Sequence, residues 1–355
     1  MCRWFAYISE KEPALLEDVL IRPDHSIVKQ VEKHYLPKLF HHVDKESDKE
    51  QRADIAARNL YFNGDGTGVA FYTPVASSYG TARHPLPQSY KTTMPPTNDI
   101  NFRSLCSNTC STTIFAHVRM ATSDVHQFNS HPFTFGRHIF MHNGVSPSSL
   151  RYVERWVRRW VRRRLAMYVG QPDSECLAGV YMTHLTGPNE DWDKEYTLEE
   201  MKTALEKAIA DVFEVQTQLV PGATRDKIPA SSLNLCTTDG NKNTGDALDN
   251  DDEQPPSLYT STTAGITLNR KFPGHPNFTR GADVPMNFAA GLLGNDTVPA
   301  EEHKDHLIIS SEPTTRDDEE WTLVPKNEAV MVQFDADGNL DWKTEKIDIP
   351  GFEGV

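Results

Sequence analysis

The chain has 355 residues, which is long enough for one large domain or two ordinary ones. Lys and Arg total 36 against 50 Asp and Glu, and the resulting net charge of -14 disfavours general binding to nucleic acid or to an anionic membrane. Five cysteines, with only Cys106 and Cys110 close together, indicate neither a disulfide framework nor a four-cysteine zinc site. We therefore expect a cytoplasmic protein that acts on a small molecule or a protein partner.

The first part of the chain predicts a strand that begins almost at the N-terminus. Residues 2–8 alternate apolar side chains in a β-like run, and residues 15–30 follow with a helical and then broken pattern. The charged stretch 44–54 and the Pro-rich stretch 84–101 predict mobile loops. No apolar run approaches the roughly 20 residues of a membrane-spanning helix, and the run MCRWFAYISEKEP lacks the basic start and apolar region expected of a secretory signal.

The middle of the chain predicts three strands and a basic helix. Strands are expected at 66–75, 111–122 and 137–145, each bounded by Gly, Asn or Ser. Residues 151–169 carry apolar side chains at the spacing of a helix face, with seven arginines on the other side. A membrane or nucleic-acid role for this helix is conceivable, but a packed helix with a solvated or partner-facing rim is favoured in so acidic a chain.

The last part of the chain predicts a second helix and further strands. A helix fits 197–219, a strand and turn fit 231–240, and the acidic stretch 241–256 predicts another mobile loop. Short strands joined by turns follow, at 306–313, 320–335 and 338–349. The order of strands, helices and strands again predicts an α+β fold rather than alternating βαβ units, and we treat residues 2–355 as a single domain.

Cys2 is the first candidate for chemistry. Removal of Met1 would leave a thiol and a free α-amine on one residue, and an amine with a pKa near ~7.7–8.0 can act as the base for its own thiol. A cysteine at a processed terminus can also be incidental. The residues that accompany it decide between these readings.

Three further segments contain residues that could form a site with Cys2. Arg119 follows an apolar strand and could grip a carboxylate, or form an ordinary ion pair. Asn143 and Gly144 end another strand, where they could stabilise an oxyanion or make a simple hairpin turn. Asp173 and the nearby Glu175 could hold an ammonium group or cap a helix.

Two alternative motifs are weaker. The glycine-rich run NGDGTG at 63–68 lacks the Lys-Ser/Thr ending of a phosphate loop and precedes a strand, so it predicts a strand-entry turn. A metal site is also disfavoured, because the histidines of this region fall in no recognised ligand spacing: His117, His126, His131 and His142. We expect neither a metal nor another cofactor.

The motifs together resemble those of class II glutamine amidotransferases. The matching runs, in order, are MCRWFAYIS, LIRPDHSIVKQ, NGDGTGVAFY, AHVRMAT, NSHPFTF, FMHNGV, PDSEC and SSEPTTRDDEEWTLVP, and they extend from residue 2 to about residue 330. Within the family the chain looks most like the Dug-type fungal subunit of cytosolic glutathione degradation. The resemblance implies an N-terminal nucleophile hydrolase fold, a four-layer αββα sandwich with two antiparallel sheets.

The resemblance also implies roles for individual residues. Cys2 matches the nucleophile, Asn143 and Gly144 the oxyanion hole, Arg119 the grip on the substrate α-carboxylate, and Asp173 the contact to the α-ammonium. Thr122 and His131 lie in matching motifs, where they would shape the substrate pocket.

The reaction implied is hydrolysis of a γ-glutamyl amide. Glutathione, with Cys-Gly as the leaving group, is favoured as substrate, in a cytosolic complex with a metallopeptidase-like partner. A γ-glutamyl hydrolase of ergothioneine biosynthesis and a glutaminase subunit of a biosynthetic amidotransferase are alternatives. A catalytically silent scaffold that recruits a partner through the basic helix is a third.

Overall fold

The structure is a computed structural model that describes residues 2–32, 63–121, 125–144, 173–187, 191–219, 233–240, 257–262, 266–270, 306–314, 321–324, 328–335 and 339–349. Its largest element is a sheet of seven strands. In spatial order these are β13 (Trp321–Val324), β11 (Ile266–Arg270), β12 (His306–Ser310), β1 (Arg3–Ser9), β6 (Thr113–Val118), β3 (Thr67–Thr73) and β4 (Leu86–Thr92). The N-terminal strand β1 therefore lies in the middle of this sheet.

A second sheet has six strands. They are β15 (Leu340–Lys346), β14 (Glu328–Phe334), β10 (Ser257–Thr262), β9 (Asn234–Thr238), β8 (His138–Asn143) and β7 (Phe133–Phe135). A short ladder joins β2 (Ala14–Leu15) to β5 (Cys110–Ser111). The pairings of both sheets among the described residues are antiparallel.

Helices flank the sheets. The described ones are α1 (Leu16–Leu20), α3 (Val75–Ser78), α4 (Ile100–Ser107), α6 (Asp173–Thr186) and α7 (Leu198–Leu219), with short 3₁₀ helices η1 (Lys29–Val31) and η3 (Gln127–Asn129). Helix α7 begins at a capping box, in which Thr197 Oγ1 accepts from Glu200 N and Glu200 Oε2 accepts from Thr197 N. None of the helices in the described part of the chain has the length and apolarity needed to cross a membrane.

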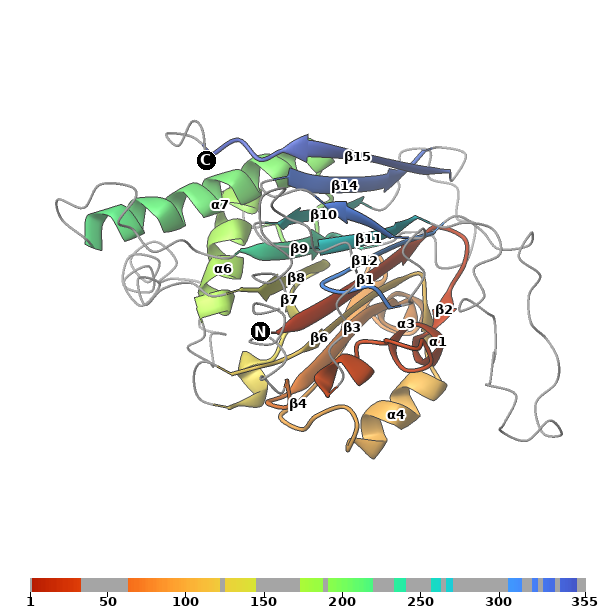
Figure 1. Ribbon diagram of the computed structural model, residues 1–355. Coiled ribbons are helices and arrows are strands. Elements are labelled where there is room, and N and C mark those ends of the chain that lie inside the picture. The colour runs from red at the N-terminus through yellow and green to blue at the C-terminus, as the bar shows by residue number, and fades with distance from the viewer. Residues whose placement is uncertain are drawn as a thin grey trace, which may run out of the picture.

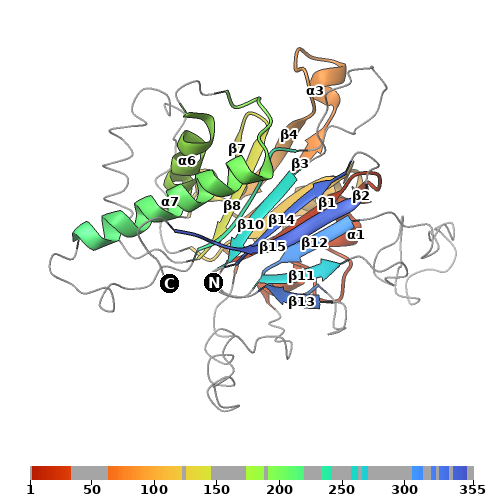
Figure 2. The same ribbon diagram turned by 90° about the horizontal axis from the view of Figure 1, so that it is seen from above.

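Three apolar clusters hold these elements together. Because side chains alternate along β1, Phe5 and Tyr7 pack toward α1 and α4, whereas Trp4 and Ile8 pack between the two sheets. The third cluster joins the six-stranded sheet to α6 and α7. Figure 1 shows α6 and α7 on one side of the sheets and α4 on the other, and Figure 2 shows α6, α7 and α1 from above. The apolar clusters thus pack α6 and α7 against the six-stranded sheet, and α1 and α4 against the seven-stranded sheet.

The prediction of an α+β fold with antiparallel sheets is confirmed. The strands expected at 2–8, 66–75, 111–122 and 137–145 and the helix expected at 197–219 are also present, within a few residues at each end. The loops predicted at 44–54 and 241–256 and the basic helix at 151–169 lie outside the described residues.

The prediction of a loop at 84–101 is wrong. This stretch contains β4, which pairs with β3, and the first two residues of α4. The prediction took Pro87 as a sign of a loop. Proline is nevertheless tolerated in a strand at the edge of its sheet, and β4 is such a strand. Asp99 belongs to the helix start, where its Oδ1 accepts hydrogen bonds from the backbone N–H groups of Asn101 and Phe102.

Candidate active site

Cys2 directly precedes β1, and its thiol lies against the chain that leaves β6. The Cys2 Sγ accepts a hydrogen bond from Met120 N at 3.3 Å and lies 3.5 Å from Met120 O. The pairing of Arg3 with Val118 sets this position, since Met120 follows two residues later. Burial raises the pKa of the Cys2 thiol above its usual value, although the Met120 amide and the Arg119 and Arg3 charges oppose this. The thiol is therefore protonated at neutral pH unless a base takes its proton.

Arg119 is the first residue after β6, and the NGDG turn holds it in place. Arg119 N donates to Gly66 O at 2.9 Å, and Asp65 N donates to Arg119 O at 3.1 Å. The Asp65 carboxylate also accepts from Ala121 N at 2.7 Å. Gly66 has a φ of +138°, and a Cβ there would lie 2.8 Å from Thr92 O, so the turn requires glycine. The run NGDGTG is a strand-entry turn, as predicted, and β3 begins at its end.

The charge of Arg119 interacts electrostatically with the Cys2 thiol. Its side chain is buried, and burial lowers the pKa of the guanidinium, while Cys2 and Asp65 raise it. A guanidinium stays charged at neutral pH in spite of such a shift. The site therefore holds a fixed positive charge near Cys2.

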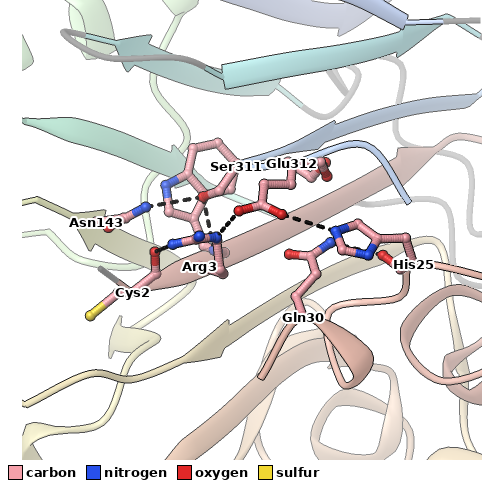
Figure 3. A network of polar contacts seen from close by, with 9 residues as sticks. Cys2, Arg3, His25, Gln30, Asn143, Ser311 and Glu312 are labelled. Atoms are coloured by element: carbon pink, nitrogen blue, oxygen red, sulfur yellow. Dashed lines mark hydrogen bonds and ion pairs between the residues drawn. The ribbon is translucent and has the colours of Figure 1, made fainter. Parts of the chain in front are cut away.

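Asn143 ends β8 in the other sheet, and a hydroxyl group connects it to β1. Asn143 Nδ2 donates to Ser311 Oγ at 3.2 Å, and the same oxygen accepts from Trp4 N at 3.0 Å (Figure 3). The Asn143 side chain is thereby tied to the strand that begins one residue after Cys2. Its Oδ1 is buried without a hydrogen-bond partner among the described residues. Gly144 follows and is partly exposed.

A buried polar network lies behind the thiol. Arg3 Nε donates to the carboxylate of Glu312, and Arg3 Nη1 donates to the backbone oxygen of Cys2 at 3.1 Å. The second Glu312 oxygen lies 2.9 Å from His25 Nε2, and Gln30 Nε2 donates to His25 O at 2.9 Å (Figure 3). The side chains of Arg3 and Glu312 are only 7% and 5% exposed. The backbone of Cys2 is thus anchored by a desolvated ion pair.

Three histidines gather beside Arg119. The ring centroids of His117 and His131 are 4.2 Å apart, and those of His131 and His142 are 6.5 Å apart. His142 Nδ1 lies 2.8 Å from Ser174 Oγ at the start of α6. Burial lowers the pKa of His117 to about 3 and that of His131 well below its usual value, with the neighbouring cations acting in the same direction. The His117 and His131 rings are therefore neutral at physiological pH.

The fourth histidine of the rejected metal hypothesis lies elsewhere. His126 caps η3, where its Nδ1 accepts from Phe128 N at 3.2 Å. Within the described ranges, no group of three or more His, Cys, Asp or Glu side chains is arranged to hold a metal ion.

Lys91 and Glu175 form a pair of interacting titratable groups near the histidines. Burial lowers the pKa of Lys91 to about 8, and the Glu175 charge opposes this. Burial raises the pKa of Glu175 to about 7, against the effect of Lys91. Lys91 Nζ also lies 4.8 Å from the centre of the Phe133 ring. Such shifted pKa values are typical of functional sites, and they extend the candidate site from Arg119 toward α6.

The structure describes some of the predicted site residues and not others. It describes Cys2, Arg119, His131, Asn143 and Gly144. Thr122 lies outside the described residues, and so does the side chain of Asp173, whose backbone begins α6.

Sequence reasoning did not single out the residues that support the site, namely Arg3, His25, Lys91, Ser311 and Glu312. Arg3, His25, Ser311 and Glu312 fall within the quoted motifs MCRW, PDHS and SSEP, and this was the available signal. Lys91 had no signal of its own.

Comparison with known proteins agrees with the motifs. No family model matches the chain. The probable glutamine amidotransferase DUG3 of Saccharomyces cerevisiae is 27% identical over 344 residues, which cover 94% of this chain and 82% of the yeast protein. A glutamine aminotransferase class-II domain protein from Silicibacter pomeroyi superposes with a TM-score of 0.50 at 17% identity, covering 98% of this chain and 100% of that chain. At this identity the likeness concerns the fold alone.

Glutamine phosphoribosylpyrophosphate amidotransferase from B. subtilis has a TM-score of 0.45 and 11% identity, and the match covers 98% of this chain and 50% of the bacillary enzyme. In sequence over most of its length, and in fold, the chain resembles the class II glutamine amidotransferases that its motifs predict.

Proposed function

We propose that the chain is an N-terminal cysteine amidohydrolase that cleaves γ-glutamyl amide bonds. The carrying observation is that the Cys2 thiol contacts the backbone next to Arg119, while Asn143 from the opposite sheet is tied to β1 through Ser311. The proposed fold is a four-layer αββα N-terminal nucleophile sandwich. The three apolar clusters, which join helix to sheet, sheet to sheet and sheet to helix, support it.

The proposed reaction begins with attack of the Cys2 sulfur on the γ-carbonyl carbon. One N–H of the Asn143 amide and the Gly144 N–H stabilise the oxyanion. Collapse of the tetrahedral intermediate breaks the C–N bond, and the leaving amine takes the proton that came from the thiol. Water then hydrolyses the thioester and releases glutamate.

The base in this mechanism is the α-amine of Cys2, after removal of Met1. The raised pKa of the thiol supports the need for a base, because a buried thiol does not ionise by itself at neutral pH. An amine on the same residue is within reach of its own thiol, directly or through one water molecule.

The glutamyl head of the substrate is proposed to bind between opposite charges. Arg119 would hold the α-carboxylate through two parallel hydrogen bonds, and Asp173 would hold the α-ammonium. Thr122 and His131 would shape the pocket around them. A neutral, buried His131 ring suits this role, since it adds no charge of its own.

We propose glutathione as the substrate, with Cys-Gly as the leaving group. The resemblance to the Dug-type subunit supports this choice, and it also supports a cytoplasmic complex with a metallopeptidase-like partner. The γ-glutamyl hydrolase of ergothioneine biosynthesis and the glutaminase subunit use the same chemistry and differ in what leaves. A silent scaffold would keep the fold and lack turnover.

The test measures glutamate released from glutathione, glutamine and other γ-glutamyl compounds, together with the mass of the N-terminal peptide. We expect a chain that begins at Cys2 and prefers glutathione. A preference for another γ-glutamyl compound selects one of the alternative enzymes. Retained Met1 and no glutamate from any compound would instead favour the scaffold.

Asn143→Ala should lower kcat by roughly 10²–10³-fold, the range for losing one oxyanion donor, and should leave KM nearly unchanged. Steady-state hydrolysis measures both constants. Asn108→Ala, at an exposed helix end, is the control and should change neither. A rise in KM at constant kcat would reassign Asn143 to substrate binding.

Arg119→Lys should raise KM by about 10- to 100-fold, because an ammonium cannot reproduce the bidentate guanidinium contact to a carboxylate. Arg103→Lys, an exposed substitution of the same type on α4, is the matched control. Substrate titrations of the two variants give the comparison. Equal KM values in both variants would remove Arg119 from the head-group site.

A further inference from the structure

Ser311 lies at a junction between the two sheets. It is the first residue after β12 and is buried. Its hydroxyl oxygen accepts one hydrogen bond from Trp4 N of β1 and one from Asn143 Nδ2 at the end of β8 (Figure 3). Two acceptor contacts use both lone pairs of a hydroxyl oxygen. The oxygen is therefore suited to hold the nitrogen end of the Asn143 amide.

Ser311 is itself fixed on both sides. Its backbone N–H donates to Trp4 O at 2.9 Å, which continues the pairing of β1 with β12. The next residue, Glu312, is held by the ion pair with Arg3 and the contact with His25. The hydroxyl oxygen thus sits on a short segment with little freedom to move.

The orientation of the Asn143 side-chain amide depends on a hydrogen-bond partner of this kind. Rotation about its terminal side-chain torsion has a broad energy profile, so the backbone alone does not set the direction of the N–H groups. Nδ2 carries two hydrogens, and Ser311 accepts one of them. Fixing the first hydrogen also fixes the direction of the second.

We propose that Ser311 is a positioning residue that aims the second N–H of Asn143 at the oxyanion of the reaction. The proposal rests on the proposed amidohydrolase function. It assigns no contact between Ser311 and the substrate, because Ser311 acts through Asn143. A donor that is aimed in advance stabilises developing charge without reorganising during the reaction.

The test is a double-mutant cycle of Ser311→Ala and Asn143→Ala, with glutathione hydrolysis as the assay, or the best γ-glutamyl substrate of the wild type. Ser311→Ala should lower kcat about tenfold at nearly constant KM, since a misaimed donor keeps part of its effect. In the Asn143→Ala background the same change should alter kcat by less than about twofold, because the group that Ser311 positions is gone.

Three controls separate positioning from a general loss of structure. Alkylation of Cys2 by iodoacetamide forms no oxyanion, so its rate should be the same in Ser311→Ala and wild type. Ser111→Ala removes another buried hydroxyl with several backbone contacts, remote from the site, and should match Ser311→Ala in its effect on Tm but leave kcat unchanged. Ser311→Thr, which keeps the acceptor oxygen, should retain kcat within about threefold.

Several results would overturn the proposal. These are an unchanged kcat in Ser311→Ala, the same factor of loss in both backgrounds, or equal losses in Ser311→Thr and Ser311→Ala. Absence of turnover in the wild type is a different result, because it removes the proposed function itself. The wild-type assay therefore distinguishes the two failures.

Discussion

Cys2→Ser is expected to fold like the wild type and to lose hydrolysis of γ-glutamyl amides by at least roughly 10³-fold, as removal of a nucleophile does in other covalent catalysts. An alcohol is much harder to ionise than a thiol, and burial already raises the pKa of the thiol at this position. Glutamate release and Tm should be measured on the same preparation. Activity near that of the wild type would remove Cys2 from the mechanism.

Cys110→Ser provides the matched control, because Cys110 is exposed and lies in the two-stranded ladder. It should keep full activity. A glutamine-mimicking electrophile should add to Cys2 and leave the other four cysteines unmodified. Cys106, Cys176 and Cys236 are buried, so the informative comparison is with Cys110, which is exposed. Labelling of Cys110 by that reagent would show that exposure, rather than the proposed site, selects the thiol.

The sequence predicted the central strands well because apolar side chains occupy consecutive positions in them, as from Trp4 to Ile8 in β1. β1 shows the reason, since both of its faces are covered by apolar clusters. The edge strand β4 was missed for the opposite reason. It has a neighbour on one side only, its residues are largely half-buried or exposed, and its sequence LPQSYKT therefore carries little alternation.

The candidate site was predictable where chemistry is local to a motif. Cys2, Arg119 and Asn143 each stand at the end of a strand, and a strand end can be recognised from the sequence. The grouping of His131 with His117 and His142 was not predictable by spacing, because it depends on how the two sheets face each other.

The polar network of Arg3, Ser311 and Glu312 could not be predicted from the sequence for a similar reason. Ser311 and Glu312 stand about 300 residues from Trp4 and Arg3 in the chain, and they meet only because β12 pairs with β1. No helical or strand period relates such residues. The motif SSEP pointed to this segment, while the partners of its side chains needed the sheet register.

The register also makes Glu312 a residue whose loss should cost the protein stability. Its carboxylate contacts Arg3 and His25 in a desolvated environment, and removing one partner of a buried ion pair leaves the other charge uncompensated. Glu312→Gln should therefore lower the free energy of unfolding by about 3–5 kcal/mol at pH 7. Urea unfolding measures this value. Glu345→Gln, which breaks partly exposed ion pairs with Lys202 and Lys343, should cost less than about 1 kcal/mol.

The effect of Glu312→Gln should also depend on pH. Desolvation raises the pKa of the Glu312 carboxyl. The Arg3 charge and the His25 contact lower this pKa by more than desolvation raises it, so the folded pKa lies below the ordinary value. A carboxylate with a depressed folded pKa adds stability that is fully present above its unfolded pKa, near ~4.3, and is lost as pH falls through the folded pKa. The difference in unfolding free energy between wild type and Glu312→Gln should be largest at neutral pH and shrink below about pH 4. A difference that stays constant from pH 7 to about pH 3 would mean that the charge of Glu312 does not stabilise this junction.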